Sequence, residues 1–364
     1  MIYLVVNNDF HIDIFMNLLP DFTDFDVCVV TIPYNLNKKF NLISNNIINI
    51  HSPYIDRKKF LNPFSFRSVK QEAAKIRFDS NDVVIFLTEY DPVNQYIVFL
   101  AKEKGAKTIL LEEGISTYYN NIILPGKRGG VKTIIKSLYI KYIIGFHFIE
   151  VKKSGGFLFL KLKDHYLDKL VLFRDISLNR NIEIEVVNSR SPAYSGLDPK
   201  GCLFLNQPIY QSYLGKEEYL EAMTQIVSQL SNQFDVVYFK FHPRDTKPIK
   251  DKVGEILSHC SNFIIVPEEF DITEAVNTYK SLYAVSFFSD ALFKLSLSGV
   301  KIVFLYHLLP KLKHHTVLKS LTKVLWLMKY YPAPSFDRLT ENNYCESLLS
   351  TKKNLSDVIR ELKT

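Results

Sequence analysis

Short apolar runs rich in β-branched residues alternate with stretches of helical periodicity along most of the chain. This alternation is typical of parallel β-sheets whose strands are connected by crossover helices. In the first half it predicts strands over 2–6, 27–32, 83–87 and 108–111 and a helix over 92–104 that stops at Gly105. In the second half it predicts strands over 202–205, 236–241, 263–266, 282–285 and 301–305, with helices over 216–233, from 271 and after 289.

The two series of strands predict an α/β protein with two Rossmann-like domains, residues 1–185 and 186–364, that face each other across a cleft. The segment 188–200 combines turn-forming residues with no apolar period, so we expect it to be a linker. A final helix is predicted over 355–363. Because sheets of this kind bind ligands at the carboxyl ends of their strands, candidate residues are sought directly after strands. Asn7, after the first strand, is one of them.

The composition fits a globular protein and excludes several classes. The 364 residues include 47% hydrophobic and 23% charged residues and carry a net charge of +7. The four cysteines lie far apart and no H-E-x-x-H occurs, so we expect a reducing compartment and no metal site. No export signal and no run of about 18 apolar residues is found, so we expect a cytoplasmic protein without a membrane-spanning anchor.

Two adjacent carboxylates follow the predicted strand 108–111, in the order Glu112, Glu113, Gly114. Neighbouring residues at a strand end point to opposite sides, so one carboxylate can face a ligand while the other is solvated or caps the backbone. A carboxylate in a partly dry cleft can take a proton from a hydroxyl group, as a general base does. An acidic turn closed by glycine is the simpler interpretation.

A histidine follows the predicted strand 236–241 in the sequence His242-Pro243-Arg244. Proline biases the residue before it toward an extended backbone, which holds the imidazole at the strand tip. From there the ring can donate a proton or a hydrogen bond to a phosphate leaving group, and Arg244 adds positive potential. An ordinary turn histidine is the alternative.

Two more carboxylates, Glu268 and Glu269, follow the predicted strand 263–266. Asp271 and Glu274 match a capping box at the start of the next helix, which gives these two residues a structural role. Glu268 and Glu269 have no such role. Either of them could accept hydrogen bonds from the two hydroxyls of a ribose.

Hydroxyl and amide side chains mark two further strand ends. Ser286 closes one strand, and Ser289 opens the next helix, where its hydroxyl and the free backbone N–H groups could bind a phosphate. A plain N-cap serine is the alternative. Asn206 and Gln207 end the strand 202–205 and are expected to face the same cleft.

Lysines and aromatic residues are interleaved between residues 127 and 169. Such a basic amphipathic stretch suits contact with an anionic membrane surface at the inner face of the plasma membrane. A buried helix whose lysines extend to solvent fits equally well. A non-catalytic membrane-associated protein is therefore an alternative of another class, whereas the scattered basic residues argue against a nucleic acid partner.

The order of these motifs resembles that of the bacterial sialyltransferases, in particular glycosyltransferase family 52 and the related bacterial polysialyltransferases. Those families share a D/E-D/E-G motif, an H-P motif and a serine motif. This chain has E-E-G, then H-P, then P-E-E, and then S-F-F-S where the family often has neighbouring serines. The resemblance covers the layout of most of the chain but few residues in identity.

The resemblance implies a GT-B fold and an inverting, metal-independent sialyltransferase without a cofactor. Its donor would be CMP-sialic acid, and its acceptor a hydroxyl of a glycan, such as a lipid-linked capsular polysaccharide repeat or lipooligosaccharide. A GT-B enzyme that uses another nucleotide sugar is the nearest alternative.

The resemblance also implies roles for individual residues. Glu112 or Glu113 would be the general base, with Glu112 favoured because the family pattern stresses the first acidic position. His242 would stabilise or protonate the departing phosphate of CMP. Glu268 or Glu269 would bind the ribose hydroxyls. Ser286 and Ser289 would bind the phosphate, with Ser289 favoured.

Overall fold

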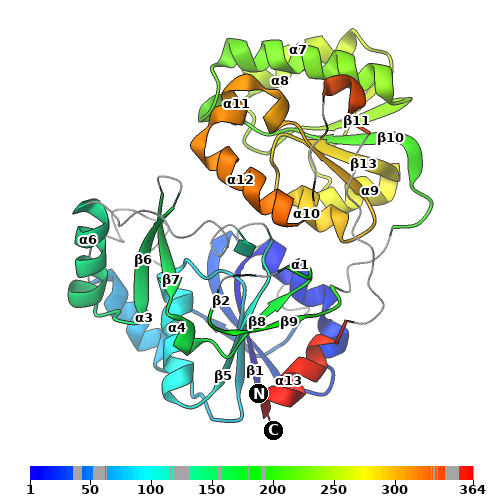
Figure 1. The fold of residues 1–364 in the computed structure, drawn as a ribbon. Coiled ribbons are helices and arrows are strands. Elements are labelled where there is room, and N and C mark those ends of the chain that lie inside the picture. Colours follow the sequence, from blue (N-terminus) through cyan, green and yellow to red (C-terminus); the bar gives the residue numbers. More distant parts are fainter. Residues whose placement is uncertain are drawn as a thin grey trace. The chain divides into compact units, whose positions relative to one another are not determined.

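In the computed structural model of the chain, the residues form two compact units, each with its own parallel sheet (Figure 1). The first unit contains residues 1–190 and 349–364, and the second contains residues 191–348. The structure describes all residues except 36–42, 52–61, 63, 115–116, 119–130, 155–156, 177, 179, 190–193, 329, 331–332, 334, 341–351 and 364.

The first unit has a seven-stranded parallel sheet with the strand order β3-β2-β1-β4-β5-β8-β9. Its strands are β1 (Ile2–Asn8), β2 (Val27–Asn35), β3 (Ile47–Asn49), β4 (Val83–Phe86), β5 (Lys107–Leu111), β8 (Lys169–Leu172) and β9 (Glu183–Val186). An antiparallel hairpin is formed by β6 (Ile149–Ser154) and β7 (Phe157–Leu162). The order reverses between β1 and β4, which is the point where sheets of this type bind ligands.

Helices lie between these strands along the chain, and a last helix follows them. They are α1 (Asp9–Asn17), α3 (Ser65–Ala73), α4 (Pro92–Glu103), α6 (Val131–Leu138) and α13 (Leu355–Lys363), with a π-helix η3 (Tyr139–Ile144) and the 3₁₀ turns η1 (Leu19–Asp21) and η4 (Asp164–Tyr166). Helix α4 begins as its sequence predicts, because the Asp91 carboxylate accepts from the N–H groups of Val93 and Asn94 and Pro92 occupies the first turn. Gly105, with φ of 82°, ends it as predicted.

The second unit has a five-stranded parallel sheet with the order β12-β11-β10-β13-β14. Its strands are β10 (Asp198–Leu205), β11 (Val236–Lys240), β12 (Phe263–Ile265), β13 (Ser281–Ser286) and β14 (Lys301–Phe304). Its helices are α7 (Lys216–Gln233), α8 (Lys247–Ser258), α9 (Ile272–Tyr279), α10 (Ala291–Ser296), α11 (Pro310–His314) and α12 (Thr316–Leu327), with the 3₁₀ turns η5 (Ile209–Gln211), η6 (Tyr306–Leu308) and η7 (Phe336–Arg338). The strand order reverses between β10 and β13.

The central strands have buried side chains on both faces of their sheets. In β1, Ile2, Leu4, Val5 and Val6 are fully buried. Such strands appear in the sequence as continuous apolar runs, which explains why the predicted strands agree with the observed ones to within a few residues. No helix in the described part of the chain is long and apolar enough to cross a membrane.

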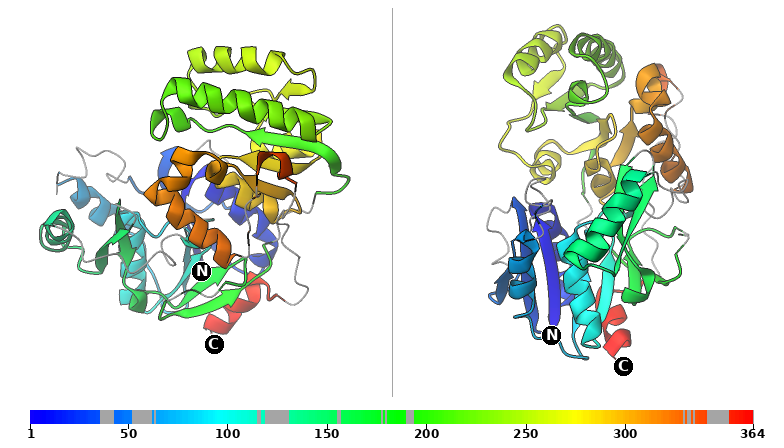
Figure 2. Two further views of the ribbon diagram at one scale, coloured as in Figure 1. Left: turned by 45° about the horizontal axis from the view of Figure 1, so that its top comes forward. Right: turned by 90° about the vertical axis from the view of Figure 1, so that its left-hand side faces the viewer.

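The last helix, α13, belongs to the first unit (Figure 2). The segment before it forms a parallel bridge between Val187 and Lys353, and the N–H of Asn188 donates to the carbonyl of Lys353 at 3.0 Å. The structure therefore differs from the expected division, which placed this helix in the second domain. The chain returns to the first unit because its C-terminal segment pairs with the residues that follow β9.

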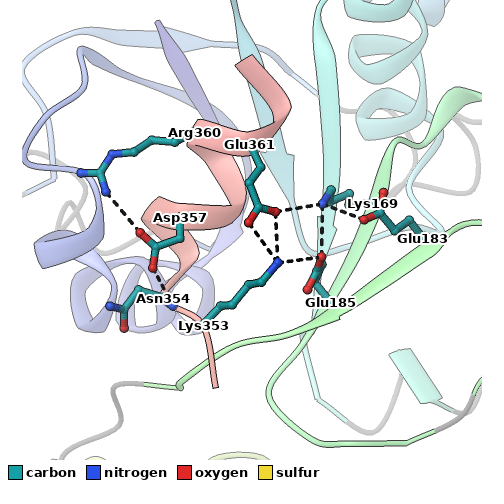
Figure 3. A network of polar contacts seen from close by, with 8 residues as sticks. All are labelled: Lys169, Glu183, Glu185, Lys353, Asn354, Asp357, Arg360 and Glu361. Atoms are coloured by element: carbon teal, nitrogen blue, oxygen red, sulfur yellow. Dashed lines mark hydrogen bonds and ion pairs between the residues drawn. The ribbon is translucent and has the colours of Figure 1, made fainter. Parts of the chain in front are cut away.

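A cluster of charges holds α13 against β8 and β9 (Figure 3). The Lys169 side chain is only 6% exposed, and its Nζ lies 2.9 Å from Glu183, 3.3 Å from Glu185 and 3.6 Å from Glu361. Lys353 contacts Glu185 and Glu361 from the other side. Burial alone would lower the pKa of Lys169, but its hydrogen bonds to Glu183 and Glu185 raise it above the usual value.

Candidate active site

Three polar side chains of the first unit meet at the carboxyl ends of β1, β4 and β5. His11 lies in α1, the helix that follows β1, while Thr88 follows β4 and Glu113 follows β5. We call them the His11–Thr88–Glu113 cluster. Because β1 and β4 are the strands between which the sheet order reverses, the cluster occupies the usual ligand-binding edge of such a sheet.

One carboxylate oxygen of Glu113 contacts both partners. The Thr88 hydroxyl donates to Glu113 Oε1 at 3.3 Å, and Nε2 of His11 lies 3.1 Å from the same oxygen. The backbone N–H of Asn7 donates to Nδ1 of His11 at 3.2 Å, so the proton of the neutral ring is assigned to Nε2. The His11 side chain is fully buried, whereas that of Glu113 is 13% exposed. The carboxylate is thus anchored from the interior and reaches solvent.

Asn7, which the sequence suggested as a ligand-facing residue, lies in the interior. Its side chain exchanges two hydrogen bonds with that of Asn94, at 3.1 and 2.8 Å, and both residues are fully buried. Asn94 also donates to the carbonyl of Thr88 at 2.9 Å. The amide pair therefore ties the end of β1 to α4 and fixes the backbone of Thr88.

Glu112 points the other way, into a buried ion pair. Its side chain is 1% exposed and contacts the guanidinium of Arg174, which is 3% exposed. Its second oxygen accepts from the hydroxyl of Tyr118 and, at 2.7 Å, from the N–H of Phe173. Burial, followed by the charge of Glu112, raises the pKa of Tyr118 well above its usual value. These contacts give Glu112 a structural role in the described residues.

Gly114 closes the E-E-G turn with φ of 150°, a conformation that residues with a side chain rarely adopt. Its carbonyl accepts from the N–H of Thr117 at 3.2 Å. The N–H of Glu113 donates to the Thr117 hydroxyl at 2.9 Å. The turn thus holds the backbone of Glu113 on both sides.

In the second unit, Asp245 organises the turn that carries His242. Asp245 is 7% exposed and accepts at 2.8 Å from the N–H of His242 and at 2.8 Å from the side chain of Asn206. Asn206 in turn accepts from the Tyr219 hydroxyl at 2.9 Å. Asn206, a predicted ligand-facing residue, is therefore a buried support for the turn at the end of β11.

His242 presents one ring nitrogen outward. Its Nδ1 accepts from the N–H of Arg244 at 3.1 Å, which assigns the proton of the neutral ring to Nε2. Nε2 has no hydrogen-bond partner among the described residues. Burial and then the charge of Arg244 lower the pKa of His242, although Asp245 opposes them, so the ring is neutral at pH 7. Pro243 and Arg244 are exposed beside it.

Gln207 and Ser286 meet at the ends of β10 and β13. Ser286 is fully buried, and its hydroxyl lies 2.7 Å from the carbonyl of Leu205 and 3.3 Å from Oε1 of Gln207. The same oxygen of Gln207 accepts from the N–H of Phe288 at 2.7 Å. This network uses the Ser286 hydroxyl internally, at the point where the sheet order of the second unit reverses.

Ser289 is half-buried and accepts from the N–H of Ala291 at 3.3 Å. The sequence predicted Ser289 at the start of the next helix. In the structure α10 begins at Ala291, and Asp290 occupies the N-cap position without a side-chain cap bond. The difference arises because the Ser289 side chain bridges the turn before the helix.

The two carboxylates after β12 differ in their contacts. Glu268 accepts from Nζ of Lys250 at 2.6 Å. Glu269 is exposed and has no such contact within the described residues. Asp271 accepts from the N–H of Glu274 at 2.7 Å, so its predicted N-cap role is confirmed. Glu268 and Asp271 therefore have structural contacts of this kind, whereas Glu269 has none among the described residues.

Sequence reasoning missed His11, Thr88, Asp245 and Arg174. Asp245 directly follows the H-P-R sequence, and His11 lies one helical turn after the first strand, so their positions held a usable signal. Arg174 had none, because its partner is 62 residues away. Among the described residues, no group of three or more His, Cys, Asp or Glu could hold a metal ion.

Solved structures with a similar arrangement of elements define the fold class. The UDP-GlcNAc 2-epimerase from Methanocaldococcus jannaschii is 12% identical, with a TM-score of 0.55 over 100% of this chain and 99% of that one. A UGT transferase from Siraitia grosvenorii in complex with UDP is 11% identical, with a TM-score of 0.53 over 100% of both chains. The chain therefore has a GT-B-type fold of two Rossmann-like domains.

The sequence assigns the family. The profile of the family described as Alpha-2,8-polysialyltransferase (POLYST) matches residues 45–307. The chain belongs to this family and is a glycosyltransferase of the sialyltransferase class. No curated protein sequence matches it significantly.

Proposed function

We propose that this glycosyltransferase uses CMP-sialic acid as its donor and transfers sialic acid, with inversion and without a metal ion or cofactor, to a hydroxyl of a glycan. The observation that carries the proposal is the Glu113 carboxylate, which is anchored by His11 and Thr88 yet reaches solvent at the carboxyl edge of its sheet. Membership in a polysialyltransferase family supports the donor and the kind of acceptor.

In the proposed reaction, Glu113 takes the proton of the acceptor hydroxyl while that oxygen bonds to the anomeric carbon of sialic acid. The bond from this carbon to the phosphate of CMP breaks, and its electron pair leaves with CMP. A single displacement of this kind inverts the anomeric carbon. We assign the base to Glu113 and not to Glu112, because Glu112 is enclosed in its pair with Arg174.

His242 is proposed to stabilise the departing phosphate through its Nε2–H. The ring is neutral at pH 7 because burial and the charge of Arg244 lower its pKa. The second pKa of a phosphate monoester is about 6, so CMP can leave near neutral pH with a hydrogen bond and without a full proton. A neutral imidazole that donates one hydrogen bond is sufficient for this role.

The other predicted residues divide into two groups. Glu269 is proposed to bind the ribose hydroxyls in preference to Glu268, which pairs with Lys250. Ser289 is proposed for the phosphate in preference to Ser286, whose hydroxyl bonds to the interior. The residues proposed to shape the substrate sites by supporting or flanking these groups are Asn7 and Gly114 in the first unit and Asn206, Gln207, Pro243 and Arg244 in the second.

The acceptor is proposed to end in sialic acid, as the family description suggests, and to be lipid-linked as in a capsular polysaccharide or lipooligosaccharide. Helix α6 and η3 support a peripheral contact with an anionic membrane. Large apolar side chains on them are 50–67% exposed, namely Ile134, Ile135, Leu138, Tyr142 and Ile143. Exposed Lys141 adds positive charge. Part of the lysine-rich stretch, including 127–130, lies outside the described residues.

The test measures CMP release from CMP-sialic acid with a sialic acid-terminated oligosaccharide, in buffer with EDTA. We expect Glu113→Gln to lower kcat by about 10²- to 10⁴-fold, the usual contribution of a general base. His242→Asn keeps an acceptor for the N–H of Arg244 but lacks the Nε2 donor, and should slow CMP release. Glu217→Gln, an exposed position on α7, is the matched control. Full activity of Glu113→Gln would contradict the assignment of the base.

A GT-B enzyme with another nucleotide sugar is the second candidate. The observation that favours it is the similar fold of the Siraitia grosvenorii transferase, whose structure contains UDP. The same assay with UDP-sugars separates the two. Release of UDP without release of CMP would replace the first proposal by the second.

A further inference from the structure

We infer that His11 is a positioning residue for Glu113. Its neutral imidazole donates the Nε2–H to the carboxylate oxygen Oε1 of Glu113 and so fixes the orientation of the carboxylate group. The inference rests on the proposed role of Glu113 as the general base. It concerns a residue that touches the base and does not touch the reacting atoms.

The end of β1 holds the ring of His11 through Asn7 and its backbone through Asn8. The N–H of Asn7 donates to its Nδ1 at 3.2 Å, and its own backbone N–H donates to the side chain of Asn8 at 3.0 Å. Its side chain is fully buried, so water does not compete for Nε2. The imidazole is therefore fixed in place, with its remaining donor 3.1 Å from Glu113 Oε1.

The same contacts exclude His11 as a relay for the proton. To take a proton from Glu113, Nε2 would have to be unprotonated, which would place the ring proton on Nδ1, and Nδ1 already accepts the N–H of Asn7. A proton on Nδ1 would place two donors opposite each other. The proton that Glu113 takes from the acceptor hydroxyl is therefore not handed to His11, and Glu113 releases it at its exposed side.

The hydrogen bond favours catalysis because it fixes the orientation of the carboxylate, so that the group meets the acceptor hydroxyl in one geometry. Thr88 donates to the same oxygen at 3.3 Å, so two donors hold Oε1 against the protein. A hydrogen bond to a charged group contributes enough that its loss should lower kcat about 10- to 150-fold. The affinity for the donor sugar should stay the same.

Two substitutions separate the two nitrogens of His11. In His11→Gln the amide nitrogen can take the place of Nε2 and keep the bond to Glu113, but the acceptor for Asn7 is lost. In His11→Asn the amide oxygen can take the place of Nδ1 and keep the bond to Asn7, but the donor to Glu113 is lost. Each variant loses the contacts of one ring nitrogen: Nδ1 contacts Asn7, whereas Nε2 contacts Glu113 and also lies 3.3 Å from the Thr88 hydroxyl. The thermal stability of both variants is therefore measured.

The test compares kcat and KM of the two variants in the CMP-release assay, with melting temperatures to confirm folding. We expect His11→Gln to keep kcat within about 3-fold of wild type and His11→Asn to lose about 10- to 150-fold, with KM for CMP-sialic acid unchanged in both. Equal activity of the two, or the reverse order, would show that His11 serves only to support Asn7 and would overturn the inference.

A measurement without substrate keeps this inference distinct from the proposed function. In ¹⁵N NMR of histidine-labelled wild-type protein at pH 7, His11 should show a protonated Nε2 and an unprotonated Nδ1, with the signal assigned by its loss in His11→Gln. A protonated Nδ1 would overturn the inference even in an active enzyme. If wild type releases no CMP, or if Glu113→Gln is fully active, the proposed function fails while the NMR result still stands.

Discussion

The buried pair of Glu112 and Arg174 gives the sharpest prediction, because the two adjacent carboxylates of the E-E-G motif should respond in opposite ways. Glu112→Gln should destabilise the first unit without touching the catalytic base. The amide oxygen can still accept from the Tyr118 hydroxyl and the N–H of Phe173, which both bond to one oxygen of Glu112. Its NH₂ group, however, faces the guanidinium of Arg174 as a second donor.

The magnitude follows from the burial of Arg174. This side chain is 3% exposed and a guanidinium keeps its charge in proteins, so Glu112→Gln removes the carboxylate that faces a buried charge. Breaking such a pair by removing one partner costs about 3–5 kcal/mol. In a domain of about 200 residues each kcal/mol lowers Tm by about 2–4 °C, so we expect a fall of roughly 10 °C.

The double variant Glu112→Gln/Arg174→Met restores most of this loss. It removes the charge that has lost the carboxylate of Glu112 and keeps the amide oxygen as an acceptor, so its cost should be about 1–2 kcal/mol, the range of a weakened hydrogen bond. The single variants Glu112→Gln and Arg174→Met should therefore together cost at least about 2 kcal/mol more than the double variant. Chemical unfolding monitored by circular dichroism measures all three.

The double variant also decides the role of Glu112. Assayed well below its Tm, it should transfer sialic acid at a rate within about 10-fold of wild type, because Glu113 and its partners are unchanged. A folded double variant that binds CMP-sialic acid but does not transfer sialic acid would make Glu112 catalytic. A single Glu112→Gln variant with the Tm of wild type would refute the argument from the buried pair.

Two further predictions concern charges of the first unit. Lys169→Met should cost about 1–3 kcal/mol of stability, because it leaves three carboxylates together around a side chain that is 6% exposed (Figure 3). The Lys353 side chain is 45% exposed, so Lys353→Met should cost less than about 1 kcal/mol. Equal changes of Tm in the two variants would contradict this. Burial would raise the pKa of Asp164, but hydrogen bonds and charge from Arg180 and then Lys161 lower it from 3.8 to about 2. Because the folded pKa is the lower one, the contribution of Asp164 to stability is present above about pH 4 and is lost as the pH falls toward 2. With solvent screening included, Asp164→Asn should cost about 1–2 kcal/mol at pH 7. Below about pH 4 the cost should become progressively smaller. A stability difference between wild type and Asp164→Asn that stays constant from pH 7 to pH 3 in urea unfolding would refute it.

The fold was predictable where strands are buried on both faces. The helix predicted over 216–233 coincides with α7, and the strand predicted over 108–111 differs from β5 by one residue. β8 and β9 were missed because they carry buried or half-buried charges, such as Lys169 and Glu185, that are uncommon in buried strands. Tertiary pairing of those charges overrides their sequence signal.

The position of α13 illustrates a second limit of prediction from the sequence. The sequence predicted the helix itself over 355–363, and the structure has it over the same residues. Its partner could not be predicted, because the contacts that hold it come from residues far apart in the chain. The N–H of Asn188 donates to the carbonyl of Lys353, and Glu361 lies near Lys169. A linear pattern gives the apolar face of a helix but not the surface that covers it.

The choice between the two carboxylates depends on the neighbouring strand. Alternation at a strand end predicted that Glu112 and Glu113 point to opposite sides, and they do. The N–H of Glu112 still donates to the carbonyl of Val171 at 2.9 Å, so Glu112 continues the pairing of β5 with β8. Its side chain therefore lies beside the residues that follow β8, where Arg174 neutralises it. Glu113 lies one residue beyond this pairing and turns toward His11. The pairing with β8, a strand that the sequence did not predict, therefore determines which of the two carboxylates points into the interior.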